Sequence, residues 1–587
     1  MSDLLRVGNC SGFYGDRFGA MREMLDRGDL DVLTGDYLAE LTMLILGRDR
    51  IKDPALGYAR TFASQLEDCL GLALDRGVRI VSNAGGLNPA GLAERVREIA
   101  LALGVSARVG YVEGDDLLSR AAELGFDDAL TANAYLGGFG IAAALAAGAD
   151  VVVTGRVTDA SLTVGPAIWW FGWDRDAYDA LAGATVAGHV IECGAQATGG
   201  NLAGGVDALA SDLPGFPIAE IAADGSAVIT KHPGTGGAVT VDSVTAQLVY
   251  EIDTPAYLGP DVISHLDTVQ IAADGPDRVR LSGTRGSLPP AESKVALNRL
   301  GGYRNSVEFL LTGLDIDAKA SAVRRQLESA LAGREPDSIE WQLVDLTESD
   351  PATQESATAR LRCLVKDTDP KRVGRRFSGA AVELALSSYA GFTLTAPPGD
   401  ATPYGVYGAA YVDQAGIQQV VVLDDGARVV IEPPVLPGHV VAGPTSLARS
   451  SLSGQTHPRT GADIPRNDLR RVPLGAVALA RSGDKGGDAN VGVWIGADHR
   501  RRDEAYDWLV ELLTPDRIRE LLPEAKGLDV ETYPLPNMKA VNVVIRGLLG
   551  EGVAASTRLD PQAKALGEWL RARHVDVPAE LLTEELL

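Results

Sequence analysis

One polar stretch of the sequence, GHVIECGAQATGGN (residues 188–201), gathers side chains that could do acid–base chemistry. Glu192 and Cys193 could act as an acid, a base or a nucleophile. Gln196 and Asn201 supply neutral donors that suit a carbonyl or enolate oxygen, and the glycines let backbone amides approach a ligand closely. For Cys193 a structural alternative stays open, since most free cysteines are small buried hydrophobic residues. These four residues are our catalytic candidates, with His189 beside them.

A second polar stretch, TGRVTDASL (residues 154–162), directly follows the apolar run ADVVV. Arg156 could hold a carboxylate or phosphate through its planar guanidinium, and Asp159 could orient that group or serve as a base. The alternative is a structural Arg–Asp pair, with Thr158 or Asp159 capping the next helix. Arg156 is therefore a candidate for substrate binding, and Asp159 is a candidate for catalysis.

Three further loops supply candidates for substrate binding. In ITKHPGTGGAVT, Lys231 and His232 stand beside a glycine-rich turn that could cradle an anion, and a plain turn between strands is an equal alternative. In VSNAGGLNP, Asn83 and Asn88 could contact a ligand, adopt a turn conformation or cap the helix that follows. Asp16, in FYGDR, completes this set.

The stretch RSGDKGGDANVG (residues 481–492) stands between two apolar runs that are typical of strands. We expect a loop, because the stretch is longer than the two to five residues that a tight hairpin needs. In an acidic protein, its cations would offer a local site for an anionic ligand. The loop would then serve as a lid or wall for the site of the large domain, or of a neighbouring subunit. Its candidates for substrate binding are Arg481, Asp484, Lys485, Asp488 and Asn490.

The elements that must position these residues follow from the apolar pattern of the first 205 residues. Short β-branched runs alternate with amphipathic segments, as in the predicted strands 4–9, 78–86 and 150–162 and the predicted helices 59–77 and 88–104. Such alternation is typical of a parallel sheet that is buried on both faces. Ligands bind to these sheets at the carboxyl ends of the strands, so the loops named above, with Asp36 in TGDYLAE, should meet at one edge.

The predicted fold class is α/β, with a large domain over residues 1–450 and a small domain over residues 469–587. In the large domain, a mainly parallel α/β part over residues 1–205 precedes a β-rich α+β elaboration over residues 206–450. The segment 451–468 is rich in Ser, Thr, Pro and Gly without an apolar period, which favours a linker. The small domain repeats strands and helices in two halves, which predicts a ferredoxin-like α+β sandwich.

Composition excludes several classes of protein. The net charge of -25 argues against a general nucleic-acid binder, which needs a basic surface for phosphates. The four cysteines are scattered, which indicates a reducing compartment rather than a disulfide scaffold. We expect a cytoplasmic protein with no membrane partner, because the first residues do not resemble a signal peptide and no run of about 18 apolar residues occurs.

Several catalytic motifs are missing. The sequence has no nucleophile elbow (G-x-S-x-G), no Walker A lysine loop and no G-x-G-x-x-G after the first strand. The seven histidines are dispersed, so a zinc site has little support. We predict no cofactor and no metal site, although a divalent metal bound by carboxylates remains open.

The stretches GNCSGFYGDR, GDYLAE, NAGGLNP, TGRVTDASL, ECGAQATGGN and KHPGTGG together resemble the acyclic terpene utilisation family, which is named for bacterial citronellol and geraniol catabolism. The stretch ARSGDKGGDANVG is similar to the small ferredoxin-fold domain that accompanies the family. The resemblance spans nearly the whole chain. It does not assign a catalytic role to any residue.

The resemblance implies an acyl-CoA or branched-acid substrate, the CoA being part of the substrate. The leading hypothesis is a hydro-lyase or lyase of branched-chain or isoprenoid acyl-CoA catabolism. In this hypothesis Asp159 or Glu192 is the base, Gln196 and Asn201 stabilise an oxyanion, and Arg156 clamps a carboxylate. The alternatives are a non-catalytic acyl-CoA-binding or scaffold subunit of a degradative complex, and a hydrolase that uses Cys193. From the size of the chain we also expect a homo-oligomer.

Overall fold

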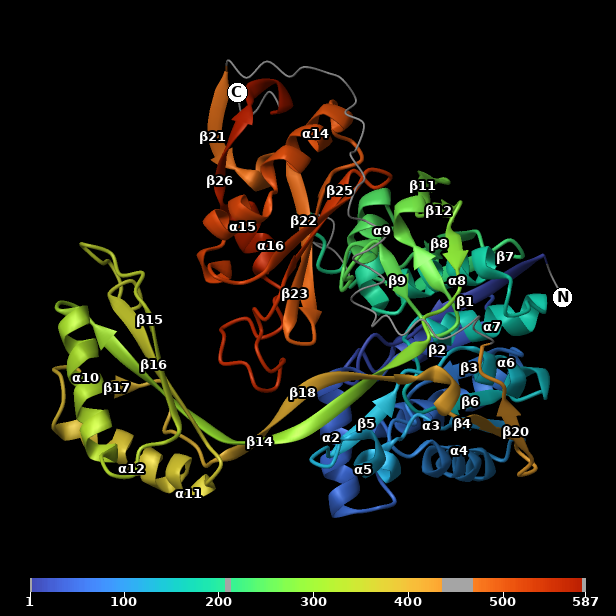
Figure 1. The fold of residues 1–587 in the computed structure, drawn as a ribbon, viewed down its shortest axis with the longest axis horizontal. Helices are drawn as coiled ribbons and strands as arrows, with labels where there is room; N and C mark the ends of the chain where they lie inside the picture. Colours follow the sequence, from blue (N-terminus) through green and yellow to red (C-terminus); the bar gives the residue numbers. More distant parts are fainter. Residues whose placement is uncertain (1–2, 206–212, 435–467, 583–587) are drawn as a thin grey trace. The chain divides into compact units, whose positions relative to one another are not determined.

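The computed structural model describes residues 3–205, 213–434 and 468–582 (Figure 1). The predicted linker therefore lies outside the described residues, apart from Asp468. The chain forms two compact units. Unit 1 comprises Met1–Asn298, Tyr407–Val553 and Asp560–Leu587, and unit 2 comprises Arg299–Val406 and Ala554–Leu559.

The main sheet of unit 1 has eleven strands, and its centre is parallel as the sequence predicted. The parallel strands lie in the order β1 (Leu4–Asn9), β2 (Val32–Gly35), β3 (Arg79–Ser82), β6 (Val151–Thr154) and β4 (Val109–Glu113). Antiparallel strands extend the sheet on both sides. Beside β1 they are β7 (Pro217–Ala222), β8 (Ala227–Lys231), β12 (Val279–Ser282) and β11 (Gln270–Ala273), and beside β4 they are β19 (Gln419–Val422) and β20 (Arg428–Ile431).

Helices cover both faces of the parallel strands, because successive strand residues point to opposite faces. Leu33, Ile80 and Val153 pack with the helices of one layer, which are α1 (Ala20–Asp26), α3 (Arg60–Asp75) and α4 (Pro89–Leu103). Their neighbours Val32 and Val152 pack with the other layer, which comprises α6 (Phe139–Ala146), α7 (Ser161–Phe171), α8 (Tyr178–Ile191) and α9 (Val241–Leu248). The predicted α/β class is confirmed.

Smaller elements complete the large part of unit 1. The helices α2 (Glu40–Lys52) and α5 (Ala121–Leu124) lie in the loops after β2 and β4. A three-stranded sheet has the order β13 (Arg285–Ser287), β10 (Ile263–His265) and β9 (Ala256–Leu258). The strand β5 (Thr131–Ala134) pairs with the first residues of β14 (Glu292–Thr312).

The small domain of unit 1 (residues 469–553 and 560–582) has the predicted ferredoxin-like fold. Its antiparallel sheet has the order β22 (Ala478–Lys485), β23 (Asp488–Ile495), β25 (Ala540–Ile545) and β24 (Val530–Leu535). The helices α14 (Arg502–Leu512), α15 (Pro515–Leu521) and α16 (Leu566–Ala572) pack against this sheet in a separate core. A further pair joins β21 (Leu469–Pro473) to β26 (His574–Pro578).

We expected a long loop at residues 481–492, and this prediction is wrong. The two strands continue until Lys485 pairs with Asp488, so only Gly486 and Gly487 form the turn. Gly486 has a φ of 65°, a left-handed conformation that glycine adopts without strain. The polar residues of this stretch are therefore strand residues of a tight β-hairpin.

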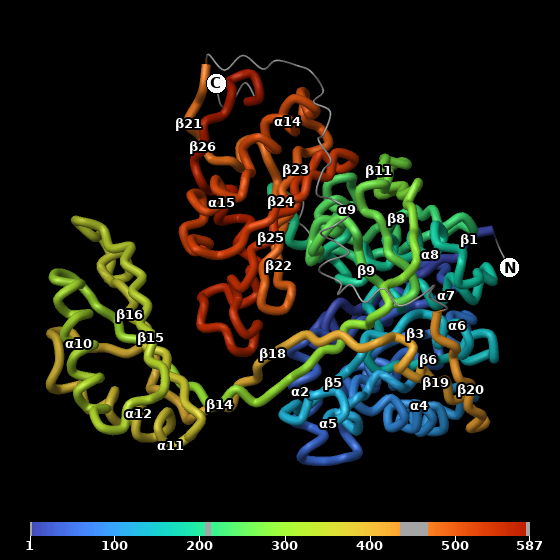
Figure 2. Tube along the Cα trace, in the orientation of Figure 1, coloured from blue at the N-terminus to red at the C-terminus, as the bar shows by residue number. Residues whose placement is uncertain are grey.

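Unit 2 is a second α+β body. Its antiparallel strands are β15 (Ser338–Val344), β16 (Thr358–Asp367), the later part of β14, and β17 (Thr393–Leu394). The helices α10 (Ile316–Leu331), α11 (Pro370–Val373) and α12 (Arg375–Glu383) lie beside them, and α10 and α12 bury Val323, Leu327 and Phe377 in one core with the strands. The chain enters along β14 and leaves along β18 (Thr402–Asp413), which pair with each other (Figure 2).

Candidate active site

The loops after β2 and β3 meet at the carboxyl edge of the parallel strands, where the sequence placed the site. The Asn83 side chain donates a hydrogen bond to Asp36 Oδ1 (2.6 Å) and accepts one from the backbone of Tyr37 (2.8 Å). Asp36 and Asn83 are both buried. Burial and the nearby carboxylate of Asp159 raise the pKa of Asp36 well above its usual range, although Arg156 and Asn83 oppose this shift.

Arg156, in the loop after β6, links these loops to Asp159. Its Nη1 donates to Asp159 Oδ1 (2.9 Å) and to the carbonyl oxygen of Leu38 (3.1 Å). The guanidinium carbon lies 4.3 Å from the centre of the Tyr135 ring, and the side chain is 4% exposed. Burial alone would lower the pKa of Arg156, but Asp159, Tyr135, Asp36 and Glu40 together outweigh burial and the pKa is raised. A permanent cation therefore stands at the edge of the sheet.

The end of α8 brings His189 and Glu192 to the same region. His189 Nδ1 lies 3.1 Å from Glu192 Oε1, and both side chains are buried. Asn9, at the end of β1, fixes this helix end because its Nδ2 donates to the Glu192 carbonyl (2.9 Å). The loop after β1 passes so close that a Cβ at Gly12 would lie 2.7 Å from the backbone of Cys193.

The pKa shifts of His189 and Glu192 both favour the neutral forms of this hydrogen-bonded pair. Burial raises the pKa of Glu192 well above its usual range, and the carboxylates of Asp159 and Glu251 add to this effect. Burial and the Lys485 ammonium lower the pKa of His189 to about 4. Glu192 Oε2 and His189 Nε2 have no hydrogen-bond partner among the described residues. The surroundings of Glu192 thus favour its protonated form, and its Oε2 has no hydrogen-bond partner in the described part of the chain.

The other catalytic candidates of this stretch have different surroundings. Burial, followed by the Glu251 and Glu192 side chains, raises the pKa of the Cys193 thiol, so the thiol stays protonated at neutral pH. Gln196 Oε1 accepts a hydrogen bond from Arg481, and the Asn201 carbonyl oxygen accepts another (3.3 Å). The Arg481 guanidinium also lies over the Tyr250 ring, at 4.3 Å.

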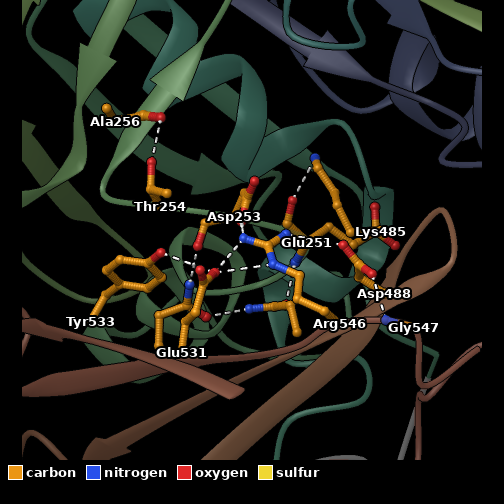
Figure 3. Close-up of polar contacts among 12 residues, drawn as sticks. Glu251, Asp253, Thr254, Ala256, Lys485, Asp488, Glu531, Tyr533, Arg546 and Gly547 are labelled. Carbon is orange, nitrogen blue, oxygen red and sulfur yellow. Dashed lines mark hydrogen bonds and ion pairs between the residues drawn. The ribbon is translucent and has the colours of Figure 1, made fainter. Parts of the chain in front are cut away.

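The hairpin of the small domain lies against the segment 249–253 of the large domain (Figure 3). Lys485 Nζ donates to the carbonyl oxygen of Glu251 (2.8 Å), and Asn490 Oδ1 accepts from the Glu251 N–H (2.7 Å). Glu251 has a φ of 54°, a strained conformation for a residue with a side chain. The Lys485 ammonium lies 5.8 Å from the centre of the Tyr257 ring, which is 4.9 Å from the His189 ring.

A further cation, Lys294 at the start of β14, lies among aromatic rings. Its Nζ is 5.0 Å from the centre of the Tyr135 ring, 5.6 Å from that of Tyr407 and 4.0 Å from Glu40 Oε1. Burial alone would lower the pKa of Lys294, but the two tyrosines and Glu40 outweigh it and raise this pKa. In turn, the pKa of Glu40 is lowered: burial opposes this shift, and the Lys294 and Arg156 cations prevail. Sequence reasoning missed Glu40, Lys294 and Tyr407.

Other candidates from the sequence are bonded elsewhere in the fold. Asn88 caps α4 by accepting from Gly91 N (2.9 Å), and Asp16 accepts from Gly12 N (2.8 Å) within its own loop. His232 Nε2 lies 3.1 Å from the Met24 carbonyl of α1. Lys231 Nζ lies 3.3 Å from Asp277 Oδ2, and Asp488 Oδ2 accepts from Arg546 Nη1 (3.0 Å). None of these contacts joins the His189–Glu192 or Arg156–Asp159 pair in the described part of the chain.

Asp484, in the hairpin, gives the site a measurable pH dependence. Burial raises its pKa to about 8, and the Glu251 and Glu40 carboxylates contribute. The unfolded chain releases this proton near pH 3.8, so the native state holds an extra proton between these values and loses stability as pH rises. We therefore predict that the free energy of unfolding of Asp484→Asn, relative to that of the wild type, increases from about pH 5 to pH 8. The increase should be up to about 1.4 kcal/mol per pH unit.

Urea unfolding across this range measures the effect of Asp484→Asn. Asp516→Asn, which changes a carboxylate that is 94% exposed, is the matched control and should show a difference that is constant with pH. A constant difference for Asp484→Asn as well would contradict the prediction.

A surface cavity of about 180 Å³ lies apart from these groups. It is lined by Asp179 and Gly183 of α8 and by Asp224–Ser226 and Ser282–Arg285. Asp179 is near the start of α8, whereas Glu192 follows its last residue. Within the described ranges, His, Cys, Asp and Glu side chains nowhere gather in threes in a way that could hold a metal ion. Every helix in the described part of the chain is too short or too polar to cross a bilayer.

Fold and site together define an α/β protein whose strand-end site is bordered by a ferredoxin-like domain. Residues 5–423 match the family model described as acyclic terpene utilisation family protein AtuA, and residues 472–576 match the AtuA ferredoxin-like domain. The chain belongs to the acyclic terpene utilisation family, as its motifs predicted. Comparisons with curated proteins and with solved structures gave no match. Membership implies a role in acyclic terpene utilisation.

Proposed function

We propose that this protein is an enzyme that acts on branched-chain or isoprenoid acyl-CoA, or on a related carboxylic acid, by hydro-lyase or lyase chemistry. The observation that carries the proposal is the buried His189–Glu192 pair beside the Arg156–Asp159 pair. The carboxyl groups of Glu192 and Asp159 have different environments. Acid–base enzymes use such a difference to assign the roles of acid and base.

In this proposal Asp159 takes a proton from the substrate and Glu192 gives one to the leaving oxygen. Glu192 suits the role of acid because its raised pKa favours the protonated form and because its Oε2 makes no hydrogen bond within the described chain. Asp159 suits the role of base because its side chain is 28% exposed and is held by Arg156. Hydration, dehydration and carbon–carbon lysis all require such a pair.

The cations around the pair suit an anionic substrate. In a chain of net charge -25, Arg156, Lys294 and Lys485 form a local positive group near the proposed acid and base. Their field favours a carboxylate and the oxyanion that develops when a proton leaves the carbon next to a thioester. A thiolate mechanism at Cys193 has less support, because the thiol is held in its protonated, weakly nucleophilic form.

Incubation of the purified protein with a branched isoprenoid-type CoA ester tests the proposal. A straight-chain acyl-CoA of equal carbon number and free CoA are the controls. We expect turnover of the branched ester, together with a thermal shift that is larger than with either control. A thermal shift without turnover would favour the non-catalytic binding subunit, and the absence of both would overturn the proposal.

A further inference from the structure

One buried carboxyl group, that of Asp115, joins three segments that meet beside the proposed base. Asp115 lies in the loop after β4 and is 2% exposed. Its Oδ2 accepts hydrogen bonds from Arg156 N (2.7 Å) and from Asn133 Nδ2 (2.8 Å). Its main-chain carbonyl oxygen accepts a third from Ala134 N (2.8 Å). Asp115 therefore ties the loop after β6 and the strand β5 to the loop after β4.

The contact between Asp115 and Arg156 is close because residue 155 is a glycine. A Cβ at Gly155 would lie 2.2 Å from Asp115 Oδ1, so any larger side chain would push the two loops apart. The Arg156 carbonyl oxygen, in turn, accepts a hydrogen bond from Leu136 N (3.2 Å). The Arg156 main chain is thus fixed at both its N–H and its carbonyl oxygen.

A fixed main chain decides where the Arg156 side chain can reach. Its Nη1 donates to Oδ1 of Asp159, the proposed base (2.9 Å), and its guanidinium lies 4.3 Å from the centre of the Tyr135 ring. Tyr135 directly follows Ala134, whose N–H is bound by Asp115, so the same residue orders both partners of the cation–ring contact. Direct hydrogen bonds therefore lead from Asp115 through Arg156 to Asp159.

We propose that Asp115 is a positioning residue, which holds the Arg156 main chain so that the guanidinium orients the Asp159 carboxylate for proton transfer. The inference rests on the proposed function. The role of Asp115 requires an acceptor oxygen rather than a charge. Burial raises the pKa of Asp115 to about 7, and the hydrogen bonds from Arg156 N and Asn133 oppose this shift. The carboxylate and the carboxylic acid both offer an acceptor oxygen, so the contact persists on either side of this pKa.

Three variants test this role by steady-state kinetics with a branched isoprenoid-type CoA ester. Asp115→Ala removes the acceptor and should lower kcat/KM by about 10²-fold, the cost of a catalytic group that is misplaced by about 1 Å. Asp115→Asn keeps an acceptor oxygen and should restore kcat/KM to within about threefold of the wild type. Gly155→Ala separates the loop from an intact Asp115 and should reproduce the loss.

A double-mutant cycle tests whether Asp115 acts through Arg156. In the Arg156→Met background, Asp115→Ala should lower kcat/KM by only about threefold or less, because the group that it positions is already gone. Equal losses in the two backgrounds would overturn the inference, since Asp115 would then act independently of Arg156. Wild-type activity of Asp115→Ala, or a loss in Asp115→Asn as large as in Asp115→Ala, would overturn it as well.

Asp367→Ala is the matched control for a general loss of stability. Asp367, in unit 2, is 4% exposed and also accepts main-chain hydrogen bonds, from Asp369 N (2.7 Å) and from Asp337 N (3.1 Å). Urea unfolding should show that this variant is destabilised, while its kcat/KM stays at the wild-type value. Equal losses of kcat/KM in Asp367→Ala and Asp115→Ala would make the effect of Asp115 structural and overturn the inference.

The outcomes separate this inference from the proposed function. If Asp115→Ala does not fold, Gly155→Ala takes its place in both backgrounds of the cycle. Each contrary result above, with an active wild-type protein, leaves the proposed function standing. A wild-type protein that turns over no thioester would overturn the proposed function and the inference together.

Discussion

Glu192→Gln should lower kcat by about 10²- to 10⁴-fold, the usual contribution of a positioned acid or base. The amide keeps the size of the side chain and its contact with His189, but it has no acidic proton to give to a leaving oxygen. The KM should change little, because substrate binding relies on the cations rather than on Glu192. Steady-state kinetics with a branched CoA ester measures both constants.

The pH dependence of the same enzyme gives a second reading of Glu192. Because the pKa of Glu192 is raised, wild-type kcat should be lost as pH rises through that pKa, at a higher pH than for an ordinary glutamic acid. The residual activity of Glu192→Gln should lack this loss. Glu98→Gln, which changes a carboxylate that is 58% exposed on α4, should behave as the wild type. Equal activity of Glu192→Gln and the wild type would exclude Glu192 as the acid.

Arg156→Met should lower the free energy of unfolding by about 3 kcal/mol at pH 7, because it leaves the partly buried Asp159 carboxylate without its buried cation. This loss is at the lower end of the range for breaking a buried ion pair, because the Asp159 side chain is 28% exposed. The Leu38 carbonyl also loses its side-chain donor, and the loop after β2 loses its tie to the loop after β6. Urea unfolding at pH 7 measures the loss.

Arg95→Met is the matched control for Arg156→Met. Arg95 forms ion pairs with Glu67 and Glu98, but its side chain is 39% exposed. Its replacement should cost about 1 kcal/mol or less, as for other surface pairs. Similar losses in the two variants would show that burial of the Arg156–Asp159 pair adds nothing to stability.

The edge of the sheet could be predicted from sequence because its signals are local. Each strand ends directly before its polar loop, and the period of two in the strands and of 3.6 in the helices indicates a sheet that is covered on both faces. Asp36, Asn83 and Arg156 do come together at that edge. Asn88 carries the same signal as Asn83, yet it caps a helix, because one residue type serves both roles.

The rest of the site could not be predicted because its residues come from segments with no local signature. Glu251 follows a helix by a few residues, and Lys294 and Tyr407 stand more than a hundred residues apart on strands that lead to unit 2. Only tertiary structure brings them to the sheet edge. The positive φ of Glu251 depends on partners in β23, which lies far along the sequence.

The hairpin was mistaken for a loop because its strands are polar. Strand predictions rely on an apolar face that packs into a core, whereas here Arg481, Lys485 and Asn490 face the carbonyl oxygens and amides of another segment. A polar strand face is stable when each group finds a partner. The pair Gly486–Gly487 was the better signal, since two glycines between alternating residues are typical of a two-residue turn.

The order of the strands has a consequence for synthesis on the ribosome. Val112 of β4 pairs with Val421 of β19, and unit 2 intervenes in the chain between them. The parallel centre can therefore form early, but its β4 edge stays unpaired until the chain has passed through most of unit 2. Unit 2 in turn waits for Ala554–Leu559. Contacts of such high sequence separation slow folding and leave an open strand edge, at which the nascent chain would depend on chaperones.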